Sequence, residues 1–222
     1  MGKLIVFEGT DGSGKSTQFS LLTQRLEQVQ TPFQKLRFPQ YEEPSSALIR
    51  MYLGGEFGSD PTAVNAYAAS TFYAVDRYAS YQKFWKDYYI GGGLLLSDRY
   101  TTSNAVHQAS KVPDGERSSF LAWLYDLEYG KMGLPKPDLV LWMDMPIDVT
   151  LALMESRQRR TDTKADIHEL DSDYLRRCYR MAKEAAAYYG WTAIACAKDG
   201  APRGIEEIHE EIYAHVRACL ED

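Results

Sequence analysis

The sequence predicts a single α/β domain in which a mostly parallel sheet of about five strands is flanked by helices. Three observations favour this fold class. Apolar runs typical of buried strands alternate with helical patterns along the 222 residues. Charged or glycine-rich segments follow several of these runs, where open α/β sheets gather their ligands. Neither an internal repeat nor a low-complexity tract interrupts the alternation.

The first elements are a buried strand and a helix. Leu4–Phe7 is a continuous run of β-prone apolar residues that ends at a glycine-rich turn, as buried parallel strands do. Apolar residues then recur at helical spacing from Gly14 onward until Pro32 stops the pattern. Residues 34–38 are expected to form a second strand, and residues 45–53 a short helix that ends at two glycines.

The middle of the chain predicts helix followed by two buried strands. Asp60 and Pro61 resemble a helix cap followed by a first-turn proline, and no later glycine or proline interrupts the chain up to Tyr89. We therefore expect one or two long helices here. Residues 94–96 and 139–144 are apolar runs that deliver charged residues at their carboxyl ends.

A charge-rich insertion precedes the last elements. Residues 155–173 contain several cations and few apolar residues, so we expect a mobile lid at about 156–171. Amphipathic helix resumes with Leu175. Residues 192–196 are a weaker candidate for the last strand of the sheet.

Composition and charge exclude several classes of protein. Hydrophobic residues make up 45% of the chain and charged residues 25%, which excludes disordered, collagen-like and disulfide-dense proteins. The 25 Lys and Arg against 31 Asp and Glu give a net charge of −6, which argues against broad binding to nucleic acid or anionic lipid. We expect neither a nucleic-acid nor a membrane partner.

Cysteine usage and hydropathy predict a cytoplasmic location. Cys178, Cys196 and Cys219 are widely spaced and show no metal-binding pattern, which favours a reduced setting. The N-terminal apolar run is too short for a signal peptide, and no stretch approaches the ~20 apolar residues of a membrane span. The mean hydropathy is −0.41.

Residues 9–16, Gly-Thr-Asp-Gly-Ser-Gly-Lys-Ser, match the phosphate-binding loop (P-loop) pattern between a predicted strand and a predicted helix. Glycines let successive N–H groups face the phosphates, and the helix N-terminus adds positive potential. Lys15 is expected to reach the β- and γ-phosphates of ATP, Ser16 to hold Mg²⁺, and Thr17 to touch the α-phosphate. A flexible glycine-rich turn is the alternative. The residues expected to bind ATP are Gly9, Thr10, Gly12, Ser13, Gly14, Lys15, Ser16 and Thr17.

The motif predicts a three-layer sandwich of the P-loop NTPase type, but it does not define the reaction. The chain has no Asn-Lys-x-Asp motif that would read guanine, and no Asp-x-x-Gly follows a later strand. A GTPase switch is therefore not expected, and the chain is short for a motor. Small P-loop kinases, nucleotide-dependent ligases and regulatory modules remain.

Four stretches, at residues 7–17, 38–41, 72–77 and 97–104, resemble the thymidylate kinase family in their order and approximate spacing. With the charged lid, the resemblance spans almost the whole chain. It implies an enzyme that uses Mg²⁺ and ATP to convert dTMP to dTDP, releasing ADP, without a covalent intermediate. Positioning and charge neutralisation should then supply most of the rate. The resemblance also implies a homodimer, for which the aromatic-rich segment 63–89 could supply the interface.

Charged residues beyond the strand at 94–96 suit the acceptor phosphate and the metal. Arg99 is a planar cation able to grip a phosphate in two places, with a surface salt bridge as the alternative. Asp98 could bind Mg²⁺ through water or cap a helix. By resemblance, Asp11 approaches the 3′-hydroxyl of the acceptor sugar or the metal region.

Two pairs of residues suit the acceptor base. Tyr73 and Arg77 lie four apart, hence on one helical face, and the resemblance assigns Tyr73 to stacking on thymine and Arg77 to a base carbonyl. The alternatives are core packing for the ring and an ion pair near Asp76 for the cation. Asn104 and Gln108 are also four apart and could present amides to a pyrimidine edge, with helix capping as the alternative for Asn104.

The lid is expected to supply catalytic cations, because the P-loop lacks the arginine found there in one branch of the family. Arg157 and Arg160, or their neighbours Arg159 and Lys164, could close over ATP and exclude water; a solvated basic face is the alternative. Glu169 belongs to a segment that resembles an acidic lid motif near the acceptor sugar. The residues expected to act in catalysis are Lys15, Arg99, Arg157, Arg160 and Asp11.

Other residues are expected around the acceptor pocket. By resemblance, Phe38, Pro39 and Tyr41 line it, although Phe38 could equally lie in the core. His107 and His168 stand where the family often has an aromatic residue, which leaves their roles open. Two alternative functions remain: a kinase for another pyrimidine nucleotide or a deoxynucleoside, and a non-catalytic ATP-binding regulatory module.

Overall fold

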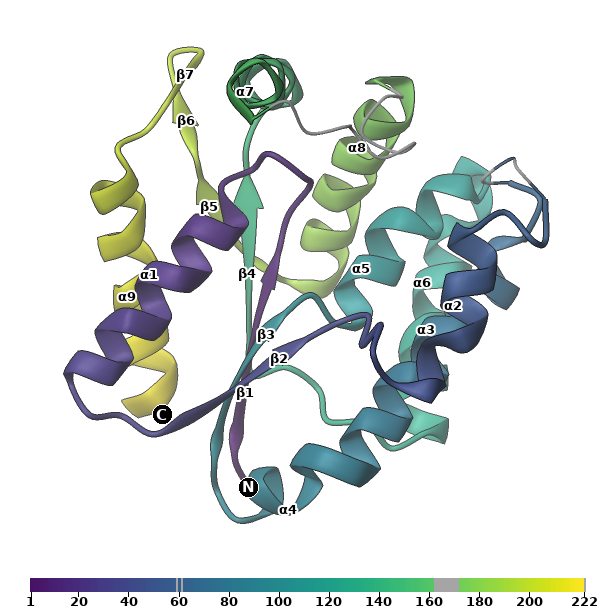
Figure 1. The fold of residues 1–222 in the computed structure, drawn as a ribbon, viewed down its shortest axis with the longest axis horizontal. Coiled ribbons are helices and arrows are strands. Elements are labelled where there is room, and N and C mark those ends of the chain that lie inside the picture. The colour runs from purple at the N-terminus through teal and green to yellow at the C-terminus, as the bar shows by residue number, and fades with distance from the viewer. Residues whose placement is uncertain (59, 61, 162–171, 222) are drawn as a thin grey trace. The chain divides into compact units, whose positions relative to one another are not determined.

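The computed structural model describes residues 1–58, 60, 62–161 and 172–221, and Figure 1 shows their course. Their contacts divide the chain into two compact units: Met1–Val6 with Phe33–Asp138, and Phe7–Pro32 with Leu139–Asp222. The expectation of one domain with a lid stays a prediction.

The five expected strands form one sheet in the order β2-β3-β1-β4-β5. Their bounds are Lys3–Glu8 for β1, Phe33–Arg37 for β2, Leu94–Asp98 for β3, Leu139–Asp144 for β4 and Thr192–Ala195 for β5. β2 pairs in parallel with β3, ending with Arg37 opposite Asp98, and β4 pairs in parallel with β5. Leu4–Phe7 are fully buried, as apolar runs in parallel sheets are. The predicted α/β fold class is confirmed.

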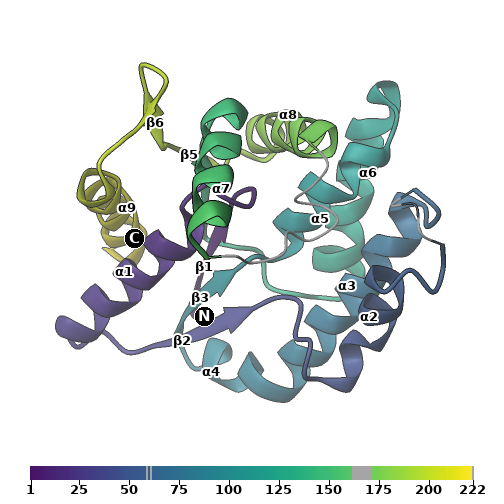
Figure 2. The same ribbon diagram turned by 45° about the horizontal axis from the view of Figure 1, so that its top comes forward.

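The first unit surrounds its strands with helices. Figure 2 shows α2, α3, α5 and α6 close together, and successive members of this group pack against each other. Trp85, Tyr100 and Phe120 are its largest fully buried aromatic side chains. The segments η2 and η5 are π-helical. The helical segments are η1 Pro44–Ser46, α2 Ala47–Leu53, α3 Ala66–Ser80, η2 Tyr81–Trp85, α4 Lys86–Ile90, α5 Thr101–His107, η3 Ala109–Lys111, η4 Asp114–Glu116, α6 Arg117–Tyr125 and η5 Asp126–Lys131.

The start of α3 differs from the prediction of a cap at Asp60. The helix begins at Ala66, and the side chain of Asn65 caps it by accepting a hydrogen bond of 2.9 Å from the backbone N–H of Ala68. Asp60 instead accepts hydrogen bonds from the backbone N–H and the hydroxyl of Thr62, both at 2.7 Å. The Asp60 side chain therefore forms a local turn with Thr62 instead of capping α3, as short polar side chains commonly do.

The second unit places helices beside β4 and β5. Its helices are α1 Lys15–Gln28, α7 Ile147–Thr161, α8 Ser172–Tyr189 and α9 Ile205–Glu221, and its hairpin strands are β6 Ala197–Lys198 and β7 Ala201–Pro202. Figure 1 shows α9 beside α1, and the Gln18 side chain donates a hydrogen bond of 2.9 Å to the carbonyl of Ile205. Arg25 joins the same two helices through an ion pair with Glu210. None of the helices in the described ranges has the length and apolar character needed to cross a membrane.

Candidate active site

The P-loop is a curled backbone between β1 and α1. The backbone N–H of Ser13 donates to the carbonyl of Thr10 at 3.1 Å, which closes the turn. Gly12 and Gly14 have φ of 80° and 84°, a left-handed conformation that L side chains avoid. Gly14 is also the N-cap of α1, and its carbonyl accepts the N–H of Gln18 at 3.1 Å. The glycines of the motif are therefore placed where the backbone requires them.

Two side chains fit this loop to a bound phosphate. Lys15 is 7% exposed, so its ammonium is largely withdrawn from bulk water. The hydroxyl of Ser13 is buried and has no hydrogen-bond partner among the described residues. A buried polar atom without a partner is costly unless a ligand or water supplies one. The loop thus combines a cation, an unpaired hydroxyl and a helix N-terminus, the arrangement that binds phosphates.

The residues expected at the metal lie in different units. Ser16 is exposed at the start of α1, and Asp98 is the last residue of β3. Across the residues that the structure describes, no group of three or more His, Cys, Asp and Glu could hold a metal ion. Asp98 does not cap α5, whose N-cap is Tyr100.

Arg99 follows β3 in a strained conformation beside α5. Its φ is 69°, a region that costs a non-glycine residue of the order of 1–3 kcal/mol and that concentrates at functional sites. Its Nη1 lies 3.2 Å from His107 Nε2 and 3.5 Å from the hydroxyl of Ser103. A guanidinium can only donate, so the imidazole accepts at Nε2. His107, whose role the sequence left open, thus contacts the cation expected to bind the acceptor phosphate.

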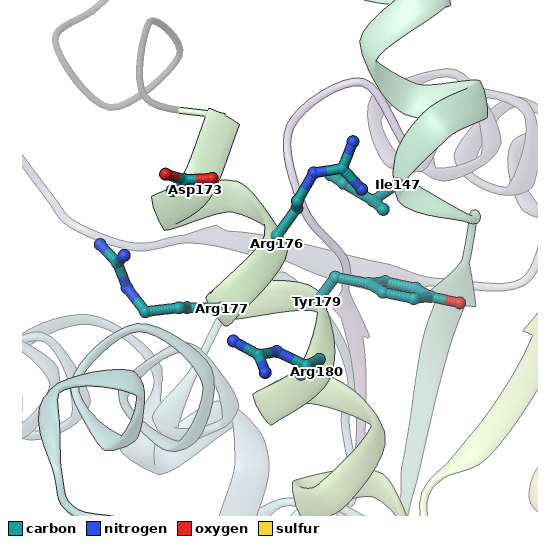
Figure 3. Close-up of a pocket in the computed structure, with 6 residues that line it drawn as sticks. All are labelled: Ile147, Asp173, Arg176, Arg177, Tyr179 and Arg180. Carbon is teal, nitrogen blue, oxygen red and sulfur yellow. The ribbon is translucent and has the colours of Figure 1, made fainter.

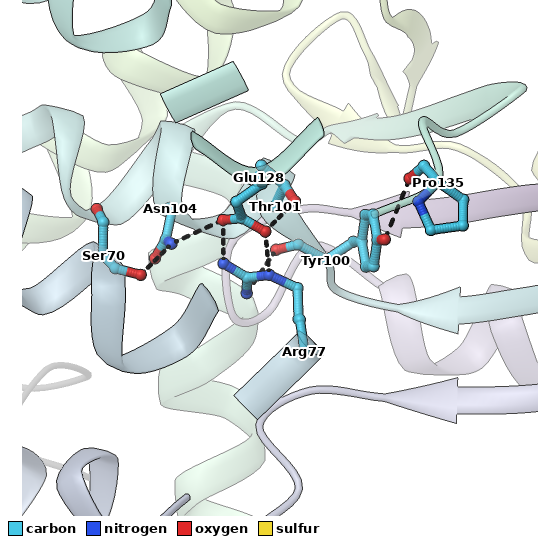
Figure 4. Close-up of polar contacts among 7 residues, drawn as sticks. All are labelled: Ser70, Arg77, Tyr100, Thr101, Asn104, Glu128 and Pro135. Carbon is cyan, nitrogen blue, oxygen red and sulfur yellow. Dashed lines mark hydrogen bonds and ion pairs between the residues drawn. The ribbon is translucent and has the colours of Figure 1, made fainter. Parts of the chain in front are cut away.

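Arg77 is the centre of a buried polar cluster, drawn in Figure 4. It forms a two-bond ion pair with Glu128, from Nε to Oε2 at 2.6 Å and from Nη2 to Oε1 at 2.5 Å. Its Nη1 donates to the carbonyl of Tyr100 at 3.4 Å. An ion pair was one alternative for Arg77, but the partner is distant in sequence, and Asp76 instead accepts hydrogen bonds from Gln40 and Ser45.

The charge of Arg77 is stable at any pH of interest. Its side chain is 2% exposed and that of Glu128 is fully buried. Burial by itself lowers the pKa of Arg77, but the charge and hydrogen bonds of Glu128 raise that pKa above its ordinary value. The guanidinium of Arg77 therefore stays charged.

Asn104 belongs to the same cluster. It lies inside α5, so it does not cap the helix, and its Nδ2 donates to the carbonyl of Ser70 at 3.2 Å and to Glu128 Oε1 at 3.4 Å. Gln108 is buried one turn later, and its Oε1 has no hydrogen-bond partner within the described chain. The two amides expected at a pyrimidine edge are therefore both buried and lie one turn apart, with Asn104 in α5 and Gln108 at its C-cap.

The aromatic residues of the expected acceptor pocket differ in exposure. Phe38 is buried, and its ring centroid lies 5.9 Å from that of Tyr100, as expected of a core residue. Pro39 and Tyr73 are half-buried, and Tyr41 is exposed. Burial raises the pKa of the Tyr73 phenol, so this ring stays neutral and is suited to stacking.

Glu128 was not among the residues predicted for the site. Its signal lies in α6, where Phe120, Leu121 and Leu124 are the buried residues. Glu128 follows Leu124 by four residues, so it continues the apolar face of that helix into η5. A carboxylate on an apolar helical face is almost never buried without a partner, and Arg77 is that partner.

The lid residues are only partly described. Arg157, Arg159 and Arg160 belong to α7. Lys164 and the segment with His168 and Glu169 lie outside the described residues.

A second basic region lies on α8, next to a cavity of about 360 Å³. Figure 3 shows Arg176, Arg177 and Arg180 spread along this helix, with Arg177 and Tyr179 extending to opposite sides of it. The hydroxyl of Tyr179 donates to Asp144 Oδ1 at 2.8 Å, which ties α8 to the end of β4. The sequence analysis did not single out these arginines, although three cations within five positions of an amphipathic helix were a visible signal.

A P-loop between a buried strand and a helix, in a five-stranded sheet of this order, defines the class of P-loop nucleotide-binding proteins. A family model described as thymidylate kinase matches residues 7–212. The chain belongs to the thymidylate kinase family, whose reaction is the ATP-dependent phosphorylation of dTMP to dTDP. The predicted family, enzyme class and reaction are confirmed, and the regulatory module and other kinases are not favoured.

Individual relatives agree with this assignment. The thymidylate kinase of Mycobacterium tuberculosis is 30% identical over 190 residues, which cover 85% of this chain and 87% of that protein. A probable thymidylate kinase of Thermococcus kodakarensis is 31% identical, with 97% of this chain and 98% of that protein covered. Among solved structures, thymidylate kinase from Candida albicans superposes with a TM-score of 0.71 at 22% identity, covering 98% of this chain and 92% of that one. This last likeness supports the fold.

Proposed function

We propose that the chain catalyses transfer of the γ-phosphoryl group from Mg²⁺-bound ATP to dTMP with the residues that its sequence indicates. The observation that carries this proposal is the P-loop, in which a buried Lys15 and the unpartnered hydroxyl of Ser13 adjoin a helix N-terminus. Phosphoryl transfer demands positioning and charge neutralisation rather than covalent chemistry by the protein. Lys15 supplies a fixed positive charge for the β- and γ-phosphates.

The acceptor side of the proposal rests on residues of the first unit. Arg99 binds the phosphate of dTMP through its guanidinium, held beside α5 by His107. Arg77 and Asn104 contact the base, Tyr73 stacks on it, and Gln108 adds a second amide. The burial of Arg77, Asn104 and Gln108 supports this assignment, because hydrogen bonds to a base discriminate best where water is excluded.

Other proposed contacts follow the family resemblance. Asp11, exposed in the P-loop, approaches the acceptor sugar. Arg157 and Arg160 neutralise charge on the transferred group, and Glu169 contacts the acceptor sugar. The other P-loop residues bind ATP, and the acceptor pocket is lined by Phe38, Pro39 and Tyr41.

The metal proposed here is Mg²⁺, held by the hydroxyl of Ser16 and, through water, by Asp98. When bound, Mg²⁺ neutralises charge on the phosphates of ATP. A hydroxyl at the start of a helix that follows a P-loop is the donor such sites use.

We also propose a homodimer in the cytoplasm. Val75 and Tyr78 are three apart on α3 and both are exposed, so they form an apolar strip suited to a second copy of the chain. Cys178 and Cys196 are buried and form no disulfide within the described residues, which suits a reducing compartment. Sedimentation of the wild type and of a Tyr78→Glu variant tests the dimer, since a charged interface residue should yield monomer.

The reaction is tested by incubating the purified protein with Mg²⁺ and ATP and separately with dTMP, dUMP, UMP, CMP or thymidine. ADP release is followed, and the product is identified by mass. We expect a clear preference for dTMP and conversion to dTDP. A Lys15→Ala variant should lose on the order of 10²-fold or more in kcat. A Lys131→Ala variant, which removes an exposed lysine paired with Asp126, should keep the wild-type rate. Thymidine phosphorylation in preference to dTMP, or no turnover, would contradict the proposal.

A further inference from the structure

We propose that Glu128 is a positioning residue that makes the enzyme select thymine over cytosine. It does so by fixing which polar atoms Arg77 and Asn104 present to the acceptor base. The inference rests on the proposed function, because it takes these two residues as the base contacts.

Glu128 uses both of its carboxylate oxygens within the cluster of Figure 4. Oε2 accepts from Arg77 Nε at 2.6 Å and from the hydroxyl of Thr101 at 2.6 Å. Oε1 accepts from Arg77 Nη2 at 2.5 Å and from Asn104 Nδ2 at 3.4 Å. Three elements, α3, α5 and η5, therefore meet at one buried carboxylate, and each of its partners is a donor.

The ion pair determines the face that Arg77 offers to a ligand. A guanidinium has five N–H donors in a fixed plane. Nε and one N–H of Nη2 are bound to Glu128, and one N–H of Nη1 is directed to the carbonyl of Tyr100. One N–H group on Nη1 and one on Nη2 remain. Both can only donate, so they suit an acceptor such as the O4 carbonyl of thymine.

Asn104 is fixed so that it offers an acceptor, whereas Arg77 offers donors. Both hydrogens of its Nδ2 have acceptors, one at the carbonyl of Ser70 and one at Glu128 Oε1. Its Oδ1 is therefore the polar atom left to face a base, and a carbonyl oxygen can only accept. It recognises the N3–H of thymine. Without Glu128, the Ser70 carbonyl alone would hold this orientation of the amide.

The two fixed atoms together form a pattern that cytosine does not match. Thymine and uracil present a carbonyl at C4 and an N–H at N3. Cytosine presents an amino group at C4 and an unprotonated nitrogen at N3, so donor would face donor and acceptor would face acceptor. Sites that leave buried polar groups unpaired reject such ligands strongly. Glu128 thus acts through its neighbours and need not touch the substrate.

The test compares kcat/KM for dTMP, dUMP and dCMP in the wild type and a Glu128→Gln variant. Glutamine keeps the shape but replaces one acceptor by a donor that faces Arg77 or Asn104. We expect the ratio of dTMP to dCMP to fall by about tenfold or more. The value for dUMP should fall in parallel with that for dTMP, and the KM for ATP should stay unchanged. The matched control is Glu210→Gln, which breaks an ion pair of the same 2.5 Å length to Arg25 on other helices; its dTMP to dCMP ratio should equal that of the wild type.

A merely structural role for Glu128 predicts a different result. The melting temperature of Glu128→Gln would fall while the dTMP to dCMP ratio stayed at the wild-type value, and this outcome overturns the proposal. Should the variant not fold, Thr101→Val removes only the hydroxyl donor to Oε2. It is expected to lower the ratio by about threefold, and an unchanged ratio again overturns the proposal. A wild type that does not phosphorylate dTMP overturns the proposed function and this inference with it.

Discussion

Replacing either Gly12 or Gly14 by alanine separates backbone strain from steric crowding in the P-loop. Both residues have nearly the same left-handed φ, so an alanine pays a similar backbone penalty of about 1–2 kcal/mol at each position. Their surroundings differ. A Cβ on Gly14 would meet nothing within 4 Å, whereas one on Gly12 would lie 2.9 Å from Met154 Cγ and 3.0 Å from Thr150 Cγ2.

The crowding adds an overpacking cost of about 1–3 kcal/mol for Gly12→Ala alone. We therefore expect the free energy of unfolding to fall by about 1–3 kcal/mol more in Gly12→Ala than in Gly14→Ala. Urea denaturation measures this difference, and the slope m should be unchanged. Adding Thr150→Ser, which removes only the crowding methyl group, should recover part of the difference in a double-mutant cycle. Equal losses in the two alanine variants, or no recovery with Thr150→Ser, would refute this reasoning.

Three further predictions concern other parts of the chain. Burial raises the pKa of the Cys196 thiol to about 12, so of the three thiols only the half-buried Cys219 should react with a thiol reagent in the native protein; reaction of all three at equal rates would contradict this. Burial, followed by the charge of Arg25, lowers the pKa of His209. As the pH falls, the unfolded chain binds a proton at His209 before the folded chain does. The contribution of His209 to the free energy of unfolding is therefore complete above about pH 6.5 and is lost as the pH falls toward the lowered pKa. When the pH is lowered from about 7.5 to about 5.5, the melting temperature of His209→Gln should therefore fall less than that of the wild type. An equal fall in the two proteins would contradict this. Asn65→Ala removes the cap of α3 and should lower the free energy of unfolding by about 1 kcal/mol, whereas Asp60→Ala leaves that cap in place and should cost less; an equal loss in both variants would contradict this.

The framework of the fold was readable from the sequence because its strands are locally marked. Residues 139–143 are a continuous apolar run that ends in a charged residue at 144, and β4 spans Leu139–Asp144. The P-loop was equally clear, since its glycines, lysine and serine have a fixed spacing. The start of α3 was not, because Asp60 and Asn65 are both competent caps, and only the packing of the helix decides between them.

The site was readable only in part, because its polar partners come from distant segments. Arg77 could be placed on a helical face, but its pairing spans 51 positions to Glu128, and no local pattern encodes such a distance. The π-helical turn of η5 adds to the difficulty, since a wider turn shifts the side chains from the positions that α-helical spacing predicts. The roles expected of Arg157, Arg160 and Glu169 stay predictions.

The buried pair of Arg77 and Glu128 constrains how this protein can change over generations. Replacing one partner alone leaves the other charge stranded in the interior, at about 3–5 kcal/mol. Typical domains have only about 5–15 kcal/mol of stability in total. A lineage that altered its base preference through either residue would pass through a poorly folded intermediate unless both codons changed together. Resistance to a thymine-mimicking inhibitor is therefore expected to arise at the rim of the pocket before it arises at this pair.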